Sequence, residues 1–222
     1  MKNKLILIST GILIFVMVLL IPVFIYTNSF ERYSFDIKFY EKEFEKYNIT
    51  EDNSILITKN LLVYLKGEER IINSNNFNTK EKYHLTEVKE VIKNTLEIKR
   101  SSAYILILVF FLLFLLCWNE NLFLKKLSYG VFGGGVITTI IFLLGLLLLL
   151  DFTGFFFKFH TIFFDSNTWL LNPESDLLIR LFPEGFFYDI SGKIFLTSFL
   201  HGLTMIAASL PMMLLYSKKQ KK

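Results

Sequence analysis

The chain has 222 residues, of which 53% are hydrophobic, and its mean hydropathy is +0.46. Apolar runs long enough to cross a bilayer exclude a soluble globular domain, and they predict an all-α integral membrane protein with four membrane helices. The formal net charge is +4, but the sequence has no basic stripe with base-stacking aromatics on a soluble fold, so nucleic-acid binding is excluded as well.

The hydropathy pattern divides the chain into eight segments. They are a first transmembrane helix at 1–26, an extracytoplasmic helical segment at 27–101, a second transmembrane helix at 102–118, a cytoplasmic turn at 119–128, a third transmembrane helix at 129–150, an extracytoplasmic or interfacial loop at 151–193, a fourth transmembrane helix at 194–216 and a cytoplasmic basic tail at 217–222. The first segment begins like a secretory signal peptide, but no small-residue cleavage site follows its long apolar core. This favours an uncleaved helix.

Basic residues are concentrated beside the apolar runs. The N-terminus, the 119–128 turn and the C-terminal tail together hold eight Lys or Arg residues and one acidic residue. Because positive charge in short flanking segments stays on the cytoplasmic side, both termini are expected in the cytoplasm and the two longer loops outside.

The segment 27–101 is expected to contain three helices. The pattern places them at Asp36–Tyr47, at Ser54–Lys66 with Gly67 as the C-cap, and at Lys80–Arg100, which runs directly into the second span. Three helices of this size have too little core to fold alone, so we expect them to pack on the membrane surface or on the 151–193 loop.

Two features of the spans are expected to be structural. Gly130 and Gly133–Gly135 open the third span, and because no Lys-Ser/Thr pair follows them, close helix packing is favoured over phosphate binding. The single cysteine, Cys117, cannot form an internal disulfide and belongs to no metal motif.

Three histidines remain as candidates for chemistry. His84 lies in the first turn of the third predicted helix with Glu87 three residues on, an arrangement typical of a surface histidine. His160 lies among phenylalanines at i±3 and i±4, where burial keeps an imidazole neutral, as a general base requires. His201 lies inside the fourth span, either as a polar contact between helices or as a functional group.

The region after His160 is predicted to begin a helix at Asn172-Pro173 and to end it at Pro183. Asp176 and Arg180 are four residues apart on that helix, so we expect them to pair and to have a structural role.

Two motifs carry a resemblance to a known family. The stretch FHTIFFDSNTWLLNPESDLLIRLFPEGFF and the shorter YHLTEVKEV, together with four spans and a large segment after the first, resemble the lipoprotein intramolecular transacylase (Lit) family of Gram-positive bacteria. The family pattern has Met after the first histidine and Asp three residues on, where this chain has Leu85 and Glu87. Glu87 keeps the carboxylate.

The resemblance implies a reaction. The family breaks the sn-2 ester of a lipoprotein's N-terminal diacylglyceryl-cysteine and moves the same acyl group to the cysteine's α-amino group. It implies diacylglyceryl-modified lipoproteins and membrane phospholipid as partners, the outer face of a bacterial cell membrane as the site of action, and no cofactor, metal or external acyl donor.

The resemblance also implies a site. The family's functional histidines match His84 and His160, which replaces the surface interpretation of His84. We expect His160 to act as general base and His84 to protonate the leaving group or stabilise the oxyanion, with the opposite assignment left open. The residues expected to bind or position the substrate are Asp165, Asn167, Trp169, Glu87, Phe156 and Phe163, and further candidates are His201 and Arg180.

Two other classes of protein remain as alternatives. One is a non-catalytic lipid- or lipoprotein-binding chaperone that uses the same aromatic surface. The other is a membrane hydrolase or metallopeptidase, but the sequence has no HExxH motif and no G-x-S-x-G elbow, and three histidines leave few ligands. An acyl-enzyme on a serine or threonine, such as Thr161, is also left open.

Overall fold

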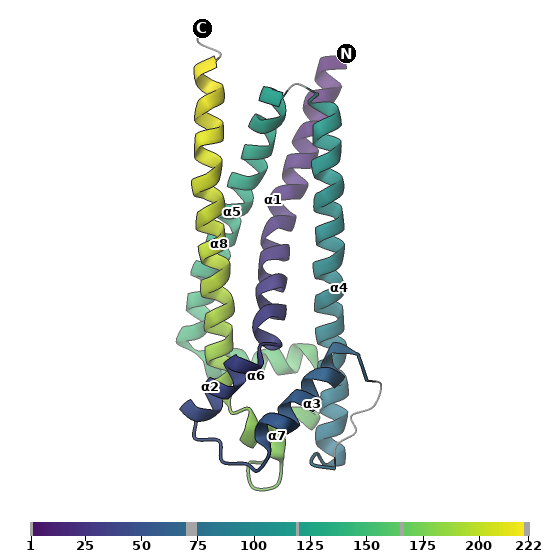
Figure 1. The fold of residues 1–222 in the computed structure, drawn as a ribbon, viewed down its shortest axis with the longest axis vertical. Helices are drawn as coiled ribbons and strands as arrows, with labels where there is room; N and C mark the ends of the chain where they lie inside the picture. The colour runs from purple at the N-terminus through teal and green to yellow at the C-terminus, as the bar shows by residue number, and fades with distance from the viewer. Residues whose placement is uncertain (1, 70–74, 119, 165–166, 220–222) are drawn as a thin grey trace. The chain divides into compact units, whose positions relative to one another are not determined.

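The computed structural model describes residues 2–69, 75–118, 120–164 and 167–219. Within these ranges every regular element is a helix, and no strand occurs (Figure 1). The elements are α1 (Lys2–Ser34), α2 (Ile37–Lys46), α3 (Ser54–Lys66), α4 (Thr79–Leu116), α5 (Glu120–Leu150), α6 (Phe152–Phe163), the 3-10 helix η1 (Asn167–Trp169), α7 (Leu177–Leu181) and α8 (Glu184–Lys219). The predicted all-α fold is confirmed.

Four helices, α1, α4, α5 and α8, are long and apolar enough to cross a membrane, as the sequence predicts. In α4 only the second half has this character. Its first 22 residues, Thr79–Arg100, contain six basic and four acidic side chains, a density of charge that hydrocarbon does not accept. The start of α4, which carries His84, therefore lies outside the membrane-spanning part of this helix.

Several helices extend beyond the expected limits. The helix α8 begins at Glu184 and not at residue 194, and α5 begins at Glu120, so most of the predicted 119–128 turn is helical. Hydropathy marks only the apolar part of a helix, whereas backbone hydrogen bonding continues into polar flanks. Residues 152–163, expected as part of a loop, form the helix α6, whose start is capped by Asp151 accepting from the Gly154 N–H at 3.1 Å.

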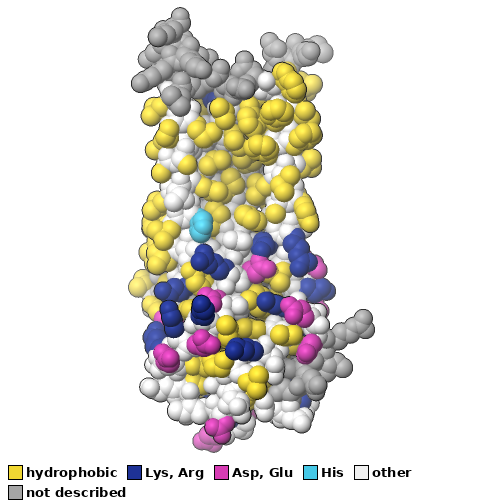
Figure 2. All heavy atoms as spheres, viewed as in Figure 1, with side chains coloured by type: hydrophobic (Ala, Val, Ile, Leu, Met, Phe, Trp, Pro, Cys, Tyr) yellow, Lys and Arg dark blue, Asp and Glu magenta, His cyan; other side chains and the backbone are white. Residues whose placement is uncertain are grey.

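The chain divides into two compact units. The four-helix unit consists of Met1–Ser29, Ile98–Gly145 and Ile194–Lys222. Its core joins Met17, Ile21 and Ile25 of α1 to Val109 and Leu113 of α4. Hydrophobic side chains cover the visible face of its long helices (Figure 2). Within this unit α1 begins and α8 ends at the same end, where α4 also gives way to α5 (Figure 1).

The glycines of α5 let its backbone approach α1 and α8 closely. A Cβ atom added at Gly134 would lie 2.7 Å from the Cβ of Ile21, and one added at Gly135 would lie 2.8 Å from the carbonyl oxygen of Gly202. Carbon atoms do not tolerate such distances, so the predicted role of these glycines in helix packing is confirmed.

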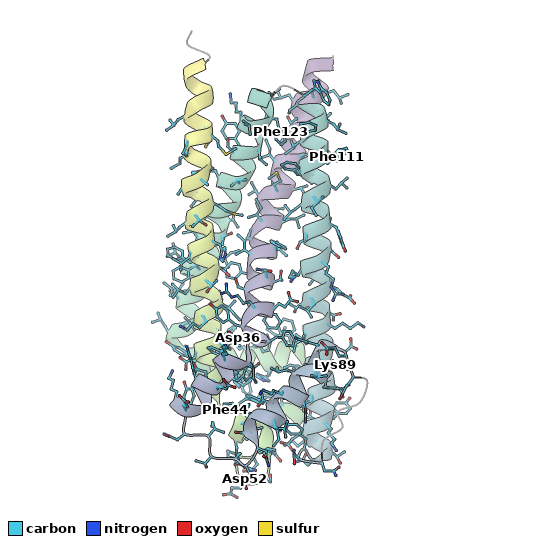
Figure 3. The ribbon with its side chains drawn as sticks, in the orientation of Figure 1. Asp36, Phe44, Asp52, Lys89, Phe111 and Phe123 are labelled. Atoms are coloured by element: carbon cyan, nitrogen blue, oxygen red, sulfur yellow. The ribbon has the colours of Figure 1, made fainter. Side chains whose placement is uncertain are left out.

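The histidine unit consists of Phe30–Glu97 and Leu146–Lys193. Part of its core is aromatic: Tyr40 of α2 packs on Phe182 and Phe186, and Phe44 packs on Phe182, with ring centroids 5.0–5.9 Å apart. Figure 3 labels Phe44 and also Asp36, which caps α2 by accepting from the Lys38 N–H at 3.1 Å.

The helix α3 ends as predicted and is joined to α4. Gly67 has φ +85°, the left-handed conformation that glycine adopts readily at a helix end. The ammonium group of Lys89 on α4, labelled in Figure 3, lies 3.9 Å from the ring centroid of Tyr64 on α3. This cation–π contact fixes α3 beside the charged half of α4.

Candidate active site

His160 lies on the last turns of α6 with one ring nitrogen occupied. Its Nδ1 atom is 2.7 Å from the carbonyl oxygen of Phe156, one helical turn earlier. A carbonyl oxygen only accepts, so Nδ1 carries the hydrogen and the neutral ring has its lone pair on Nε2. The Phe156 ring packs on His160 at 4.2 Å, and the side chain is buried. Burial lowers the pKa of His160 below its ordinary value, although the Phe156 carbonyl acts in the opposite direction.

His84 lies on the charged half of α4 and is also buried. Its Nδ1 atom is 3.7 Å from an oxygen of Glu87, and this atom makes no hydrogen bond within the described residues. Burial, together with the nearby His160, lowers the pKa of His84 to about 4, and Glu87 offsets part of this effect. Near neutral pH His84 is therefore an uncharged imidazole.

The two imidazoles face the same small region. Their ring centroids are 6.0 Å apart and their planes differ by 31°. Phe164 lies against both, 4.8 Å from His84 and 5.3 Å from His160. This spacing is too long for a direct hydrogen bond between the rings, but one reacting group can contact both histidines.

The 3-10 helix η1 lies against His160 and against the helix that carries His84. The Trp169 ring lies 5.0 Å from that of His160 at an interplanar angle of 33°, and it also contacts Phe157 at 5.2 Å. One residue earlier, the Thr168 hydroxyl donates to Glu87 at 2.9 Å. The segment after α6 therefore contacts both helices that carry the histidines.

Five of the predicted site residues are brought together: His84, His160, Glu87, Phe156 and Trp169. They come from α4, α6 and η1, which supports the grouping made from the two motifs.

The remaining predicted residues lie elsewhere or cannot be placed. Phe163 is 52% exposed and packs on Phe159, and Asn167 is exposed in η1. Asp165 lies outside the described residues. His201 belongs to the four-helix unit, where its Nδ1 atom is 2.7 Å from the Thr197 carbonyl oxygen of the same helix, and its side chain is exposed.

The expected pairing of Asp176 with Arg180 is wrong. The Arg180 Nε donates to Glu51 at 2.7 Å, and its contact with Asp176 is a 3.3 Å hydrogen bond to the backbone carbonyl. The Asp176 carboxylate instead accepts from the Asn78 amide at 2.8 Å and lies 3.8 Å from the Lys80 ammonium. These contacts and the Asn172 N–H, the largest cause, lower the pKa of Asp176.

The cause of this difference is the start of α7. The helix begins at Leu177, and residues 173–175 form a turn in which the Asn172 side chain accepts from the Glu174 N–H at 3.0 Å. Asp176 is thus the residue before the first helical turn, so it does not stand one turn from Arg180 on a helix face.

Arg180 borders an open pocket of about 510 Å³, whose other walls include Tyr47, Glu51, Pro173, Pro183 and Glu184. Neither histidine lines this pocket. The candidate site is therefore identified from the two buried imidazoles and not from this pocket.

The sequence analysis placed Phe164 beside His160, four residues on, but did not include it among the site residues. Thr168 was missed, and no local pattern could have found it, since its partner Glu87 is 81 residues away along the chain. In the described part of the chain, no group of three or more His, Cys, Asp or Glu residues is arranged to hold a metal ion.

Comparison with known proteins gives a consistent result. The model of the family described as lipoprotein intramolecular transacylase Lit matches residues 6–187. An uncharacterized protein of Aquifex aeolicus (strain VF5) is 26% identical over 182 residues, which cover 79% of this chain and 83% of that protein.

Solved structures agree in fold. The in meso structure of the membrane integral lipoprotein intramolecular transacylase Lit from Bacillus cereus superimposes with a TM-score of 0.81 at 19% identity, covering 96% of this chain and 99% of that one. Two variants of the same protein, with a histidine replaced by arginine or alanine, give TM-scores of 0.74 at 18% and 19% identity, each over 96% of this chain and over 95% and 96% of those chains. Because the family model covers well over half of the sequence, the chain is a member of the lipoprotein intramolecular transacylase (Lit) family.

Proposed function

We propose that this transacylase moves the sn-2 acyl chain of a diacylglyceryl-cysteine lipoprotein to the α-amino group of the same cysteine at the His84–His160 pair. The product is an N-acyl, lyso-form lipoprotein. The observation that carries the proposal is the pair itself: two buried, neutral imidazoles 6.0 Å apart, in a family whose reaction needs proton transfer.

His160 acts as the general base. Its Nδ1–H is held by the Phe156 carbonyl, so Nε2 takes the proton that the α-amine loses as nitrogen attacks the ester carbonyl. When the tetrahedral intermediate collapses, the carbon–oxygen bond to glycerol breaks and the same Nε2 returns the proton to the sn-2 oxygen. No proton is gained or lost over the cycle.

His84 stabilises the oxyanion. Its pKa of about 4 keeps the ring uncharged near neutral pH, so it serves as a hydrogen-bond donor and not as a proton reservoir. Glu87 lies 3.7 Å from Nδ1, and its charge stabilises positive charge that develops on the ring as His84 donates.

The amine and the ester belong to one molecule, so holding them in the right orientation supplies much of the reduction in activation free energy. Holding two groups in attack geometry is worth ~7–11 kcal/mol. Trp169, Phe156 and Phe164 are rigid walls for this purpose. On α6, Phe157, Ile162 and Phe163 are more than half exposed and provide an apolar surface for acyl chains and membrane phospholipid.

We further propose that the active site lies at the outer face of the bacterial membrane, with both termini in the cytoplasm. The support is charge: the three basic segments flank the start of α1, the α4–α5 junction and the end of α8, which lie at one end of the four-helix unit (Figure 1).

Mass spectrometry of lipoproteins tests the activity. A host that makes diacylglyceryl lipoproteins and expresses this chain should yield N-terminal peptides with one acyl chain on nitrogen and one on glycerol. Unmodified amines at normal levels of the membrane protein would contradict the proposal and favour the chaperone alternative.

A further inference from the structure

Glu81 is a buried carboxylate that joins two distant parts of the histidine unit. It is 1% exposed, and one oxygen accepts from the Asn78 N–H at 2.7 Å, while the other accepts from the Leu178 N–H at 2.6 Å. The first contact caps α4 in the usual way, together with the reciprocal bond from the Glu81 N–H to the Asn78 side chain at 3.0 Å. The second contact holds the first turn of α7, which has no cap from its own preceding residue Asp176.

The neighbours of Glu81 hold the preceding loop in the same way. The Asn78 amide donates to Asp176 at 2.8 Å, and the Lys80 ammonium donates to the Leu170 carbonyl oxygen. Further along α4, Glu87 accepts from Thr168 at 2.9 Å. The segment 167–178 is therefore attached along its length to the first turns of α4.

The segment 167–178 carries Trp169, whose ring lies 5.0 Å from that of His160 on α6. The helix to which this segment is attached, α4, carries His84. We infer that Glu81 is a positioning residue for the transfer reaction: it fixes the segment 167–178 on α4 and so keeps the Trp169 ring against His160, beside His84. The inference rests on the proposed catalytic pair.

Both carboxylate oxygens are needed for this role. In Glu81→Gln an NH₂ group, which only donates, replaces one carboxylate oxygen, so one of the two backbone N–H groups loses its acceptor. Leaving a buried N–H without a partner is unfavourable, and the loop then relaxes toward water.

Fluorescence of Trp169 reports this relaxation. The chain has two tryptophans, and Trp118→Phe leaves Trp169 as the only one. In this background, with the full chain in detergent, Glu81→Gln should raise the acrylamide quenching constant of Trp169 and shift its emission to longer wavelength. The matched control is Glu90→Gln on the same helix, an exposed residue paired with Lys93 at 3.9 Å, which should change neither value.

Turnover with a diacylglyceryl lipopeptide provides the second measurement. Glu81→Gln should lower kcat by about 10- to 100-fold, because small misplacements of a reacting geometry have effects of this size. KM should change little, since the apolar surface of α6 is untouched. The acid limb of the pH profile should also move to higher pH, because His160 becomes more hydrated. Among the described residues, the titratable group facing His160 is His84 of α4, and Glu87 faces His84.

Lys80→Ala provides an independent test if the Glu81→Gln protein fails to accumulate in the membrane. The Lys80 side chain is 41% exposed, and after its removal the buried Asp176 carboxylate still accepts from Asn78, the Asn172 N–H and Ser175, yet the contacts of Lys80 with Leu170 and Asp176 are deleted. The same fluorescence change and a smaller loss of kcat are expected.

The outcomes separate this inference from the proposed function. If Glu81→Gln leaves the quenching constant of Trp169 unchanged, or raises it while kcat stays normal, the positioning role is overturned and the histidine pair is unaffected. Full activity in His84→Ala and His160→Ala instead overturns the proposed site, whatever the fluorescence of the Glu81 variant shows.

Discussion

The Nδ1 atom of His160 lies 2.7 Å from the carbonyl oxygen of Phe156, and this contact decides which nitrogen can act as a base. It fixes the hydrogen on Nδ1 and leaves the ring's basic lone pair on Nε2. In many histidine bases a carboxylate orients the ring, but here a backbone carbonyl does so, without adding a charge that would raise the pKa strongly. A neutral base in an aromatic setting follows from this arrangement.

Substitution of either histidine should remove most of the activity. Positioned acid–base groups typically contribute about 10²- to 10⁴-fold, so His160→Ala and His84→Ala should each lose activity on that scale while the protein remains in the membrane. Product formation by mass spectrometry is the measurement. His201→Ala and Cys117→Ala are the controls and should retain activity, because His201 is exposed and bonds within its own helix, and Cys117 is buried in the four-helix unit. Normal turnover in His160→Ala would rule out the proposed base.

The protonation of His160 should occur at unusually low pH. Burial disfavours the imidazolium, so the folded-state pKa lies below the ordinary value of 6.5, and the ring stays neutral as the pH falls through 6.5. Trp169, 5.0 Å from His160, reports this in the Trp118→Phe protein, since an imidazolium quenches indole fluorescence. The quenching midpoint should lie below pH 6.5 and disappear in His160→Gln. A midpoint at or above 6.5 would show that His160 is solvated or paired with a negative charge.

The features that were predicted correctly from the sequence are those that depend on residues close together along the chain. The helix end at Gly67 follows from local chemistry, and the aromatic surroundings of His160 follow from spacing along one helix. The glycines of α5 were also interpreted correctly, because small residues inside an apolar span allow neighbouring helix backbones to approach closely.

The contacts that could not be predicted from the sequence join residues that are far apart along the chain. Arg180 has Asp176 four residues before it, yet its guanidinium pairs with Glu51, 129 residues away. Glu81 could be recognised as a capping residue from Asn78 three positions earlier, but not as the partner of Leu178. The two histidine motifs are separated by more than seventy residues, so their meeting was implied by family resemblance and not by any local pattern.

Thiol labelling tests the orientation in the membrane. In a Cys117→Ala background, cysteines introduced at Asn75 and Asn172 should react with an impermeant reagent in intact cells, and one at Lys125 should react only after lysis. The reason is the basic excess on the proposed cytoplasmic side. Labelling of position 125 alone in intact cells would reverse the orientation.

Helix packing in the four-helix unit should be sensitive to a single methyl group. In Gly135→Ala the new Cβ meets the Gly202 backbone oxygen at 2.8 Å, and neither backbone can move freely, so we expect a loss of about 1–3 kcal/mol. Gly11→Ala is the matched control, because no atom lies within 4 Å of its added Cβ. Thermal unfolding in detergent compares the two, and equal melting temperatures would mean that α5 and α8 are not packed as described.

The central claim is that the acyl group moves within one lipoprotein molecule. Two diacylglyceryl lipopeptides that differ in peptide mass and carry isotopically distinct sn-2 chains are mixed with the purified enzyme, and tandem mass spectra locate each label. Intramolecular transfer predicts that each peptide keeps its total mass, acquires an amide that blocks N-terminal sequencing, and carries only its own label on nitrogen. Crossed labels, a gain of one acyl chain from phospholipid or a loss of one chain by hydrolysis would contradict the account.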